Sequence, residues 1–155
     1  MRSILLFAVL AILPCAGRAQ CTTSVSFQSY GSGCNTVSGQ VPALSGSFDT
    51  QTCTVSLTLT GFPGCCNTFL VGRVFFLGGA QVNTPLPGIG PGCALLARPD
   101  LPVAFATGAE DTLRFAVPDG FPALTLYSQG ANVYFTTIGF GTDVELSQGL
   151  ALVFS

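Results

Sequence analysis

The residues of this chain that could do chemistry are its cysteines, a few acids and three tyrosines. Two of the seven cysteines, Cys65 and Cys66, stand side by side in GFPGCCNTFLVG, residues 61–72. A structural zinc site needs Cys-x2-4-Cys pairs or histidine, and a thioredoxin-like site needs Cys-x-x-Cys at the start of a helix; neither pattern occurs here. A disulfide between adjacent cysteines would be strained. Because successive strand residues point to opposite faces, we interpret Cys65 and Cys66 as halves of two different disulfides.

Nucleophilic catalysis has no base available in this sequence. Serine and threonine are abundant, but the chain contains no histidine and no lysine. The Ser-His-Asp, Cys-His and Ser-Lys arrangements are therefore excluded. A glycosidase would need two carboxylates facing each other across a cleft, and nothing in the sequence places two acids in that way. We predict that the protein is not an enzyme and that it has no cofactor.

The acidic groupings are Glu110–Asp111 and Asp143-x-Glu145. In a strand, Asp143 and Glu145 would share a face and could supply oxygen ligands to calcium. A calcium loop normally has three or more acidic or amide ligands close together, however. We favour the simpler interpretation that these acids form a solvated strand edge, which discourages aggregation between sheets.

Tyrosines offer a second binding hypothesis. Tyr127 and Tyr134 flank one predicted turn, YSQGAN, and could be neighbours across a hairpin. They would then form part of a platform for carbohydrate. The commoner role of such tyrosines is to cap a core with the hydroxyl group in water, and we favour that role.

The N-terminus has the pattern of a secretory signal. A short positive region, MRS, precedes the apolar run ILLFAVLAIL, and Pro14 and the small residues of AGRA follow. A run of ten residues is too short to span a bilayer, which takes roughly 20. We predict cleavage after Ala19, secretion or cell-surface localisation, and no membrane insertion. Acylation of Cys15 is the disfavoured alternative, because Pro14 stands where a small residue is needed.

The remaining residues, 20–155, form one predicted domain. They keep three arginines against seven acids, a net charge of −4. Nothing in this composition could neutralise a row of phosphates, so nucleic acid is excluded as a partner. Charged residues make up 8% of the chain, against about 25% in ordinary soluble domains. Such a surface suits an extracellular module, or one that packs against neighbours.

Six cysteines follow the predicted cleavage point, and an even number in a small exported domain indicates a disulfide framework. Three disulfides among six cysteines allow fifteen pairings. Cys53 is the natural partner of Cys65 or Cys66, because a strand and a turn lie between them. Cys21 would pair with the other one and hold the N-terminal tail, which leaves Cys34 and Cys93.

The apolar pattern predicts short strands throughout. In CTVSLTLTGF, residues 53–62, Val55, Leu57 and Leu59 alternate with hydroxyl side chains. TLRFAV repeats this pattern, and Gly, Pro, Asp or Asn separate the segments. The other predicted strands are SVSFQSY, VPALSGSF, FLVGRVFFL, CALLARP, VAFATG, ALTLYS, NVYFTTIGF and GLALVFS. GGAQVNTPLPGIGPG, residues 78–92, is predicted as a loop.

No helical periodicity longer than two turns occurs outside the signal. Strands every 8–12 residues with alternating faces predict an all-β fold, an antiparallel two-sheet β-sandwich of jelly-roll or immunoglobulin type. We expect eight to ten strands, disulfide staples, and phenylalanines filling the space between the sheets.

One set of motifs is similar to a known family. YGSGC (30–34), VPALSGSF, LTLTGFPG, PLPGIGPGCALL, AVPDGFPALTLYSQG and LSQGLALVF follow one another in order. Together they resemble a β-rich domain of uncharacterised function in secreted proteins of planctomycetes and similar bacteria, over residues 27–154. The resemblance implies a disulfide between Cys34 and Cys93, and it implies no catalytic residue. Cys21, Cys53, Cys65 and Cys66 depart from the family pattern.

These observations lead to one functional hypothesis and one alternative. The hypothesis is a secreted, non-catalytic structural or interaction module whose partner is an extracellular or cell-surface protein or glycan. The alternative is an extracellular carbohydrate- or calcium-binding module that uses Tyr127, Tyr134 or Asp143 and Glu145.

Overall fold

The computed structural model describes residues 21–36, 40–61, 68–101, 104–106, 111–137 and 141–155. The predicted signal peptide, residues 1–19, lies outside these ranges. The described residues form ten strands and no helix: β1 (Val25–Tyr30), β2 (Ala43–Asp49), β3 (Thr54–Thr60), β4 (Thr68–Gly78), β5 (Gln81–Pro85), β6 (Ala94–Ala97), β7 (Ala104–Ala106), β8 (Thr112–Ala116), β9 (Leu124–Thr136) and β10 (Gly141–Phe154).

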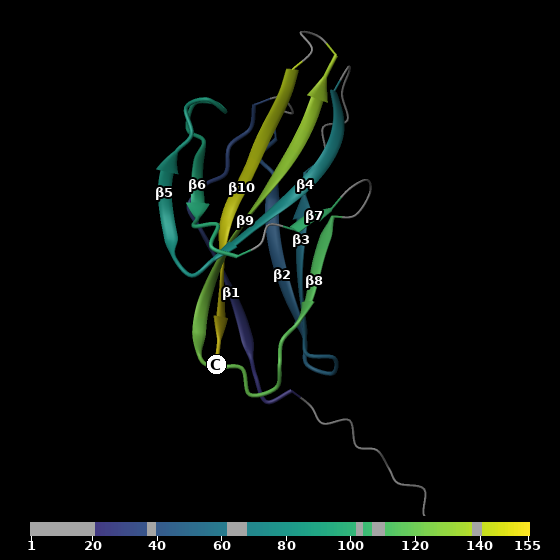
Figure 1. The fold of residues 1–155 in the computed structure, drawn as a ribbon, viewed down its shortest axis with the longest axis vertical. Helices are drawn as coiled ribbons and strands as arrows, with labels where there is room; N and C mark the ends of the chain where they lie inside the picture. The colour runs from purple at the N-terminus through teal and green to yellow at the C-terminus, as the bar shows by residue number, and fades with distance from the viewer. Residues whose placement is uncertain (1–20, 37–39, 62–67, 102–103, 107–110, 138–140) are drawn as a thin grey trace, which may run out of the picture.

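The strands form two main sheets and one small hairpin (Figure 1). The large sheet has the order β1-β10-β9-β4-β7, and the small sheet has the order β2-β3-β8. β5 and β6 pair only with each other. All pairs are antiparallel. The predicted all-β, disulfide-stapled sandwich is therefore confirmed, with the β5–β6 hairpin as an addition to the two sheets.

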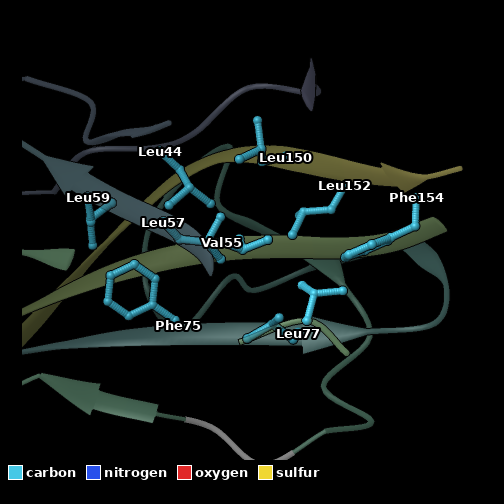
Figure 2. Close-up of a cluster of buried hydrophobic side chains, with 10 residues drawn as sticks. Leu44, Val55, Leu57, Leu59, Phe75, Leu77, Leu150, Leu152 and Phe154 are labelled. Carbon is cyan, nitrogen blue, oxygen red and sulfur yellow. The ribbon is translucent and has the colours of Figure 1, made fainter. Parts of the chain in front are cut away.

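The main core lies between the large and small sheets. The alternation in β3 places Val55, Leu57 and Leu59 inside with no exposed surface, while the hydroxyl side chains between them face outward. Phe75 and Leu152, from β4 and β10 of the large sheet, face them (Figure 2). Burial of these apolar side chains is the main force that holds the two sheets together.

The expectation for phenylalanine is confirmed only in part. Phe75 and Phe154 belong to the core between the sheets, but Phe69 and Phe135 are exposed. Those two residues face each other in the register of β4 and β9, on parts of the strands that extend past the small sheet (Figure 1).

The predicted turn YSQGAN is instead the centre of a continuous strand. β9 runs from Leu124 to Thr136, and Ser128, Gln129 and Gly130 in its middle are buried. A Cβ atom on Gly130 would lie 2.6 Å from a methyl carbon of Leu59 in the opposite sheet. The glycine serves close packing between the sheets, and its resemblance to a turn signal misled the sequence interpretation.

A second core covers the outer face of the large sheet. It contains Val74, Ala131 and Leu146 from that sheet, together with Cys34 and Cys93. The two cysteines form a disulfide, which is the pairing that the family resemblance implied. Part of the predicted loop 78–92 is instead the strand β5, which pairs with β6. This hairpin lies next to the disulfide, because Cys93 immediately precedes β6.

The predicted pairing of Cys53 and Cys21 with Cys65 and Cys66 is wrong. Cys53 bonds to Cys21, with a Cα–Cα distance of 5.7 Å. Cys53 immediately precedes β3, and Gly61 immediately follows it, so the seven-residue strand separates them by about 23 Å. A disulfide spans at most about 7 Å between Cα atoms, so a partner beyond Gly61 would have to fold back along the whole strand. Cys65 and Cys66 lie outside the described residues.

Candidate functional site

Glu145, one residue of the predicted acidic pair, belongs to a row of polar residues that crosses the large sheet. Glu145 on β10 lies opposite Asn132 on β9, and Asn132 lies opposite Arg73 on β4. We call Arg73, Asn132 and Glu145 the polar row. All three are buried, with exposed fractions of 7%, 0% and 1%. They share the face that carries Phe75, so the polar row continues the main core toward the extended ends of β4, β9 and β10.

Hydrogen bonds tie the polar row to the surrounding chain. The Arg73 Nε donates to Asn132 Oδ1 at 3.2 Å. The Asn132 Nδ2 donates to the carbonyl oxygen of Gly61 at 2.9 Å, and the Thr36 backbone N–H donates to Glu145 Oε1 at 3.4 Å. Two loops, after β1 and after β3, are thereby fastened to the large sheet. These hydrogen bonds hold the polar row and the two loops in one arrangement.

Tyr134 belongs to the same environment and is not a surface platform. It has no exposed surface, and its hydroxyl makes no hydrogen bond of good geometry. Burial raises the pKa of this phenol, and the nearby Glu145 carboxylate raises it further. Since Tyr127 and Tyr134 lie on one strand and only Tyr134 is fully buried, the predicted hairpin pair is wrong. The favoured interpretation, a core-capping tyrosine with its hydroxyl group in water, is also wrong for Tyr134.

Asp143 and Glu145 do share a face, but they do not form a solvated edge. Asp143 is half-buried and accepts a hydrogen bond from Thr136 Oγ1 at 2.7 Å. Glu145 is buried in the polar row, so the interpretation as a solvated edge is wrong for that residue. Among the described residues, no group of three or more His, Cys, Asp or Glu could hold a metal ion. Asp111 is half-buried, and Glu110 lies outside the described residues.

Tyr127 contributes to a different concave region, on the outer face of the large sheet. Tyr30 on β1 packs its ring edge-on against Tyr127, with centroids 5.7 Å apart. Gly149 permits this arrangement, because a Cβ atom there would collide with the Tyr30 ring. The resulting depression, of about 240 Å³, is lined by Gln28, Ser29, Tyr30, Gln81, Thr125, Tyr127, Ala151 and Val153. We call this region the tyrosine shelf.

The sequence analysis did not find the tyrosine shelf. Tyr30 and Tyr127 are far apart in the chain, and β10 lies between their strands. The Tyr30 hydroxyl donates to the carbonyl oxygen of Leu96 at 3.0 Å, and burial raises the pKa of this phenol to about 12. The one signal that could have located the shelf is the Tyr-Gly-x-Gly sequence at residues 30–33, where the strand ends.

Two Ser-Gln-Gly sequences, 128–130 and 147–149, have structural roles. The Gln129 side chain accepts from the Leu96 N–H at 2.9 Å and donates to the carbonyl oxygens of Ala94 and Ser147. It thereby attaches β6 to the large sheet. Gln148, in the bulge of β10, donates to the Leu44 carbonyl oxygen at 2.9 Å and accepts from its N–H at 3.3 Å. This second glutamine joins the edge strand β2 to the large sheet.

These features define a class: a disulfide-bonded antiparallel β-sandwich whose buried polar groups support the fold. No family model, no curated protein and no solved structure matches the chain. Within the described ranges, no helix is long and apolar enough to cross a membrane.

Proposed function

We propose that the protein is a secreted, non-catalytic structural or interaction module that acts outside the cytoplasm. The pair of disulfides, Cys21–Cys53 and Cys34–Cys93, is the observation that carries this proposal. Disulfides persist in oxidising compartments and are rare in the cytosol. The signal-like N-terminus favours the same compartment.

An exposed apolar patch favours an interaction role. It consists of Phe69 and Val71 on β4 and Phe135 on β9, with exposed fractions of 61%, 55% and 38%. Phe69 and Phe135 are direct register partners, so the exposed rings are neighbours. Contiguous apolar surface of this kind is typical of contact sites.

The arginines favour a protein or glycan partner over nucleic acid. Arg73 is buried, and Arg98 Nε is paired with Asp100 Oδ1 at 2.6 Å. Arg114, the third arginine after residue 20, is exposed and does not take part in the Arg98–Asp100 pair. A single such cation cannot supply the row of phosphate contacts on which nucleic-acid affinity depends.

Mapping of free thiols tests the compartment. The protein is purified from its natural source, denatured without reductant, alkylated, digested and analysed by mass spectrometry. We expect Cys21, Cys34, Cys53 and Cys93 to remain unmodified and to appear in the two cross-linked peptide pairs. Alkylation of these four residues would overturn the proposal of an oxidising compartment.

Binding to the source organism's intact cells tests the interaction role. Labelled protein is compared with the double variant Phe69→Ser/Phe135→Ser and with the control Val41→Ser, which alters another exposed apolar residue. We expect saturable binding that the double variant loses and the control retains. Absence of saturable binding, or equal binding by all three proteins, would contradict this role of the patch.

The tyrosine shelf favours a second candidate function, glycan binding. It combines the Tyr127 ring with the polar side chains of Gln28, Gln81 and Thr125, and such a mixture of ring face and amide groups is suited to a sugar. A glycan array with wild type, Tyr127→Ala and the control Phe135→Ala separates the two candidates. Binding that only Tyr127→Ala abolishes would favour the glycan role, and an array without any signal would exclude it.

A further inference from the structure

A second concavity lies in the main core, where the gap between the sheets opens to solvent. Its volume is about 330 Å³. The lining residues come from both sheets and from the segments beside them: Leu77, Leu101, Leu113, Phe115, Ala116, Val117, Pro118, Phe121, Leu126 and Phe154. We call this concavity the apolar pocket.

The opening lies at the Leu77 end of β4. β7 begins at Ala104, opposite Phe75 of β4, and runs from there away from Leu77. β8 is the edge strand of the small sheet on the same side. Leu101 donates its N–H to the Leu77 carbonyl oxygen at 3.1 Å, and Leu101 itself is 43% exposed. At this end, Leu77 of β4 and Leu113 and Phe115 of β8 line the pocket.

The described lining is almost entirely apolar. The ten lining side chains of the described residues are all apolar, and four large ones, Leu113, Phe115, Phe121 and Leu126, are only half-buried. These four pack against the main core, where such side chains are normally covered completely. A ligand that replaces water here would recover apolar burial that the fold leaves incomplete.

The volume sets the size of the ligand. A protein cavity of about 150 Å³ lined by apolar side chains takes one benzene molecule. By that comparison, the apolar pocket holds roughly a dozen carbon atoms. This size corresponds to a medium-length alkyl chain and exceeds any single amino-acid side chain.

The charges beside the pocket bear on the head group of a ligand. Asp100 precedes Leu101, and Asp119 follows Pro118. Hydrogen bonds from Arg98 to Asp100 and from Thr22 to Asp119 lower the pKa of both carboxyls, so both are ionised at neutral pH. Arg98 is paired with Asp100. The exposed Arg114, between the lining residues Leu113 and Phe115, carries a charge equal and opposite to that of Asp119. The charges beside the lining therefore sum to zero, and they favour neither an anionic nor a cationic head group at the mouth.

We propose that the apolar pocket binds the alkyl chain of an uncharged amphiphile, with the chain between the two sheets and the head group in solvent. This site is separate from the exposed patch of Phe69, Val71 and Phe135. Its test is therefore independent of the proposed interaction role.

Calorimetric titration of the full protein tests the proposal with three probes that share one chain length. The probes are dodecyl maltoside, dodecanoate and dodecyltrimethylammonium, each kept below its micelle concentration. We expect saturable one-to-one binding of dodecyl maltoside and weaker binding of both charged probes. Absence of dodecyl maltoside binding would overturn the proposal, and tighter binding of dodecanoate or of dodecyltrimethylammonium would overturn the assignment of the head group.

Variants locate the binding site. Ala116→Trp places a large side chain at the rim of the pocket, at an exposed position that does not disturb the core. Leu113→Trp fills the interior, and Val71→Trp is the control at an exposed position elsewhere. We expect Ala116→Trp to bind dodecyl maltoside about tenfold more weakly than the wild type does, because about two methylene groups of the alkyl chain would remain in water. Equal affinity of Ala116→Trp and Val71→Trp would overturn the location, whether or not Leu113→Trp folds.

Discussion

Asp143 and Glu145 are two residues apart on β10, yet their environments differ. Asp143 is half-buried and contacts Thr136, whereas Glu145 is buried in the polar row with Asn132 and Arg73. A buried carboxylate is tolerated where hydrogen-bond donors and a positive charge compensate for its desolvation. The acidic pattern Asp143-x-Glu145 suggested calcium binding, but the structure gives Glu145 a role in the buried polar row.

The two acids should differ in their effect on stability. We expect Glu145→Gln to lower the free energy of unfolding by about 2 kcal/mol, because it removes the charge from the hydrogen bond with the Thr36 N–H and brings an amide NH2 group into a buried site. Asp143→Asn should lower it by less than about 1 kcal/mol, because only one hydrogen bond to a partly exposed carboxylate is altered. Urea denaturation followed by circular dichroism measures both. Equal effects would contradict the structural role of Glu145.

Tyr30 makes stability depend on pH in the alkaline range. Its pKa is raised to about 12, so the folded state retains a proton that the unfolded chain releases near pH 10. The contribution of Tyr30 is therefore complete below pH 10 and is lost as the pH rises from 10 to 12. Absorbance at the phenolate band follows the ionisation of all three tyrosines, and comparison with Tyr30→Phe isolates the contribution of Tyr30.

We expect the pH titration to show a late phenolate step near pH 12 whose amplitude Tyr30→Phe reduces, with the remaining late ionisation due to the buried Tyr134. The alkaline loss of stability should become smaller in the same variant. A titration curve that Tyr30→Phe leaves unchanged above pH 11 would show that Tyr30 ionises normally, contrary to its burial and its bond to Leu96.

Among the elements, β9 and β10 carry most of the structural detail. These two long strands pair from Gly141 and Thr136 at one end to Phe154 and Leu124 at the other, with one bulge near Ser147. The bulge directs Gln148 toward β2, while Gln129 on β9 reaches β6. These two side-chain amides thus make hydrogen bonds to β2 and to β6, each of which has a neighbouring strand on one side only. For Gln148, the bulge in β10 directs the side chain toward β2, a role in which bulges are common.

Gly130 tests whether the centre of β9 is a packed strand. Gly130→Ala introduces a Cβ atom 2.6 Å from a methyl carbon of Leu59, so the fully buried Leu59 side chain must shift within the packed core. We expect a loss of about 2 kcal/mol in the free energy of unfolding. Gly141→Ala is the matched control at the start of β10, because nothing lies within 4 Å of its Cβ position. A neutral result for Gly130→Ala would favour the turn that the sequence predicted.

At the scale of the whole molecule, the two disulfides hold different parts of the sandwich. Cys21–Cys53 fastens the N-terminal segment to the start of β3. Cys34–Cys93 is buried in the second core, on the opposite side of the large sheet from the main core. The disulfides therefore stabilise both ends of a fold whose strands pair mostly over long sequence distances.

The disulfides should contribute unequally. The enclosed loops, with sequence separations of 32 and 59 residues, each contribute about 4 kcal/mol in the chain-entropy model. Cys34→Ala/Cys93→Ala also removes buried sulfur from the second core, whereas Cys21→Ala/Cys53→Ala removes a half-buried link. We expect the first double variant to have the lower melting temperature by calorimetry. The reverse order would contradict the role of Cys34 and Cys93 in that core.

The sequence by itself determined the strand content and the class of fold. Alternation of apolar and hydroxyl residues in β3 is a local pattern, and it reports directly which side of a strand is buried. The same reasoning located most of the other strands and predicted an antiparallel sandwich. It failed where one residue type has two uses, as at Gly130, because a glycine that permits a turn also permits close packing.

Only the tertiary structure decided which distant residues meet. Glu145 is buried in the row that it forms with Asn132 and Arg73 across three neighbouring strands. Cys53 pairs with Cys21 because both lie at the end of the sandwich where β3 begins, while the chain after Cys53 runs along β3 to the far end. The apolar pocket likewise exists because residues of both sheets, such as Leu77 of β4 and Phe115 of β8, meet at one end of the main core. A local pattern contains no information about strand order, since the order depends on contacts that form only when the sheets pack together.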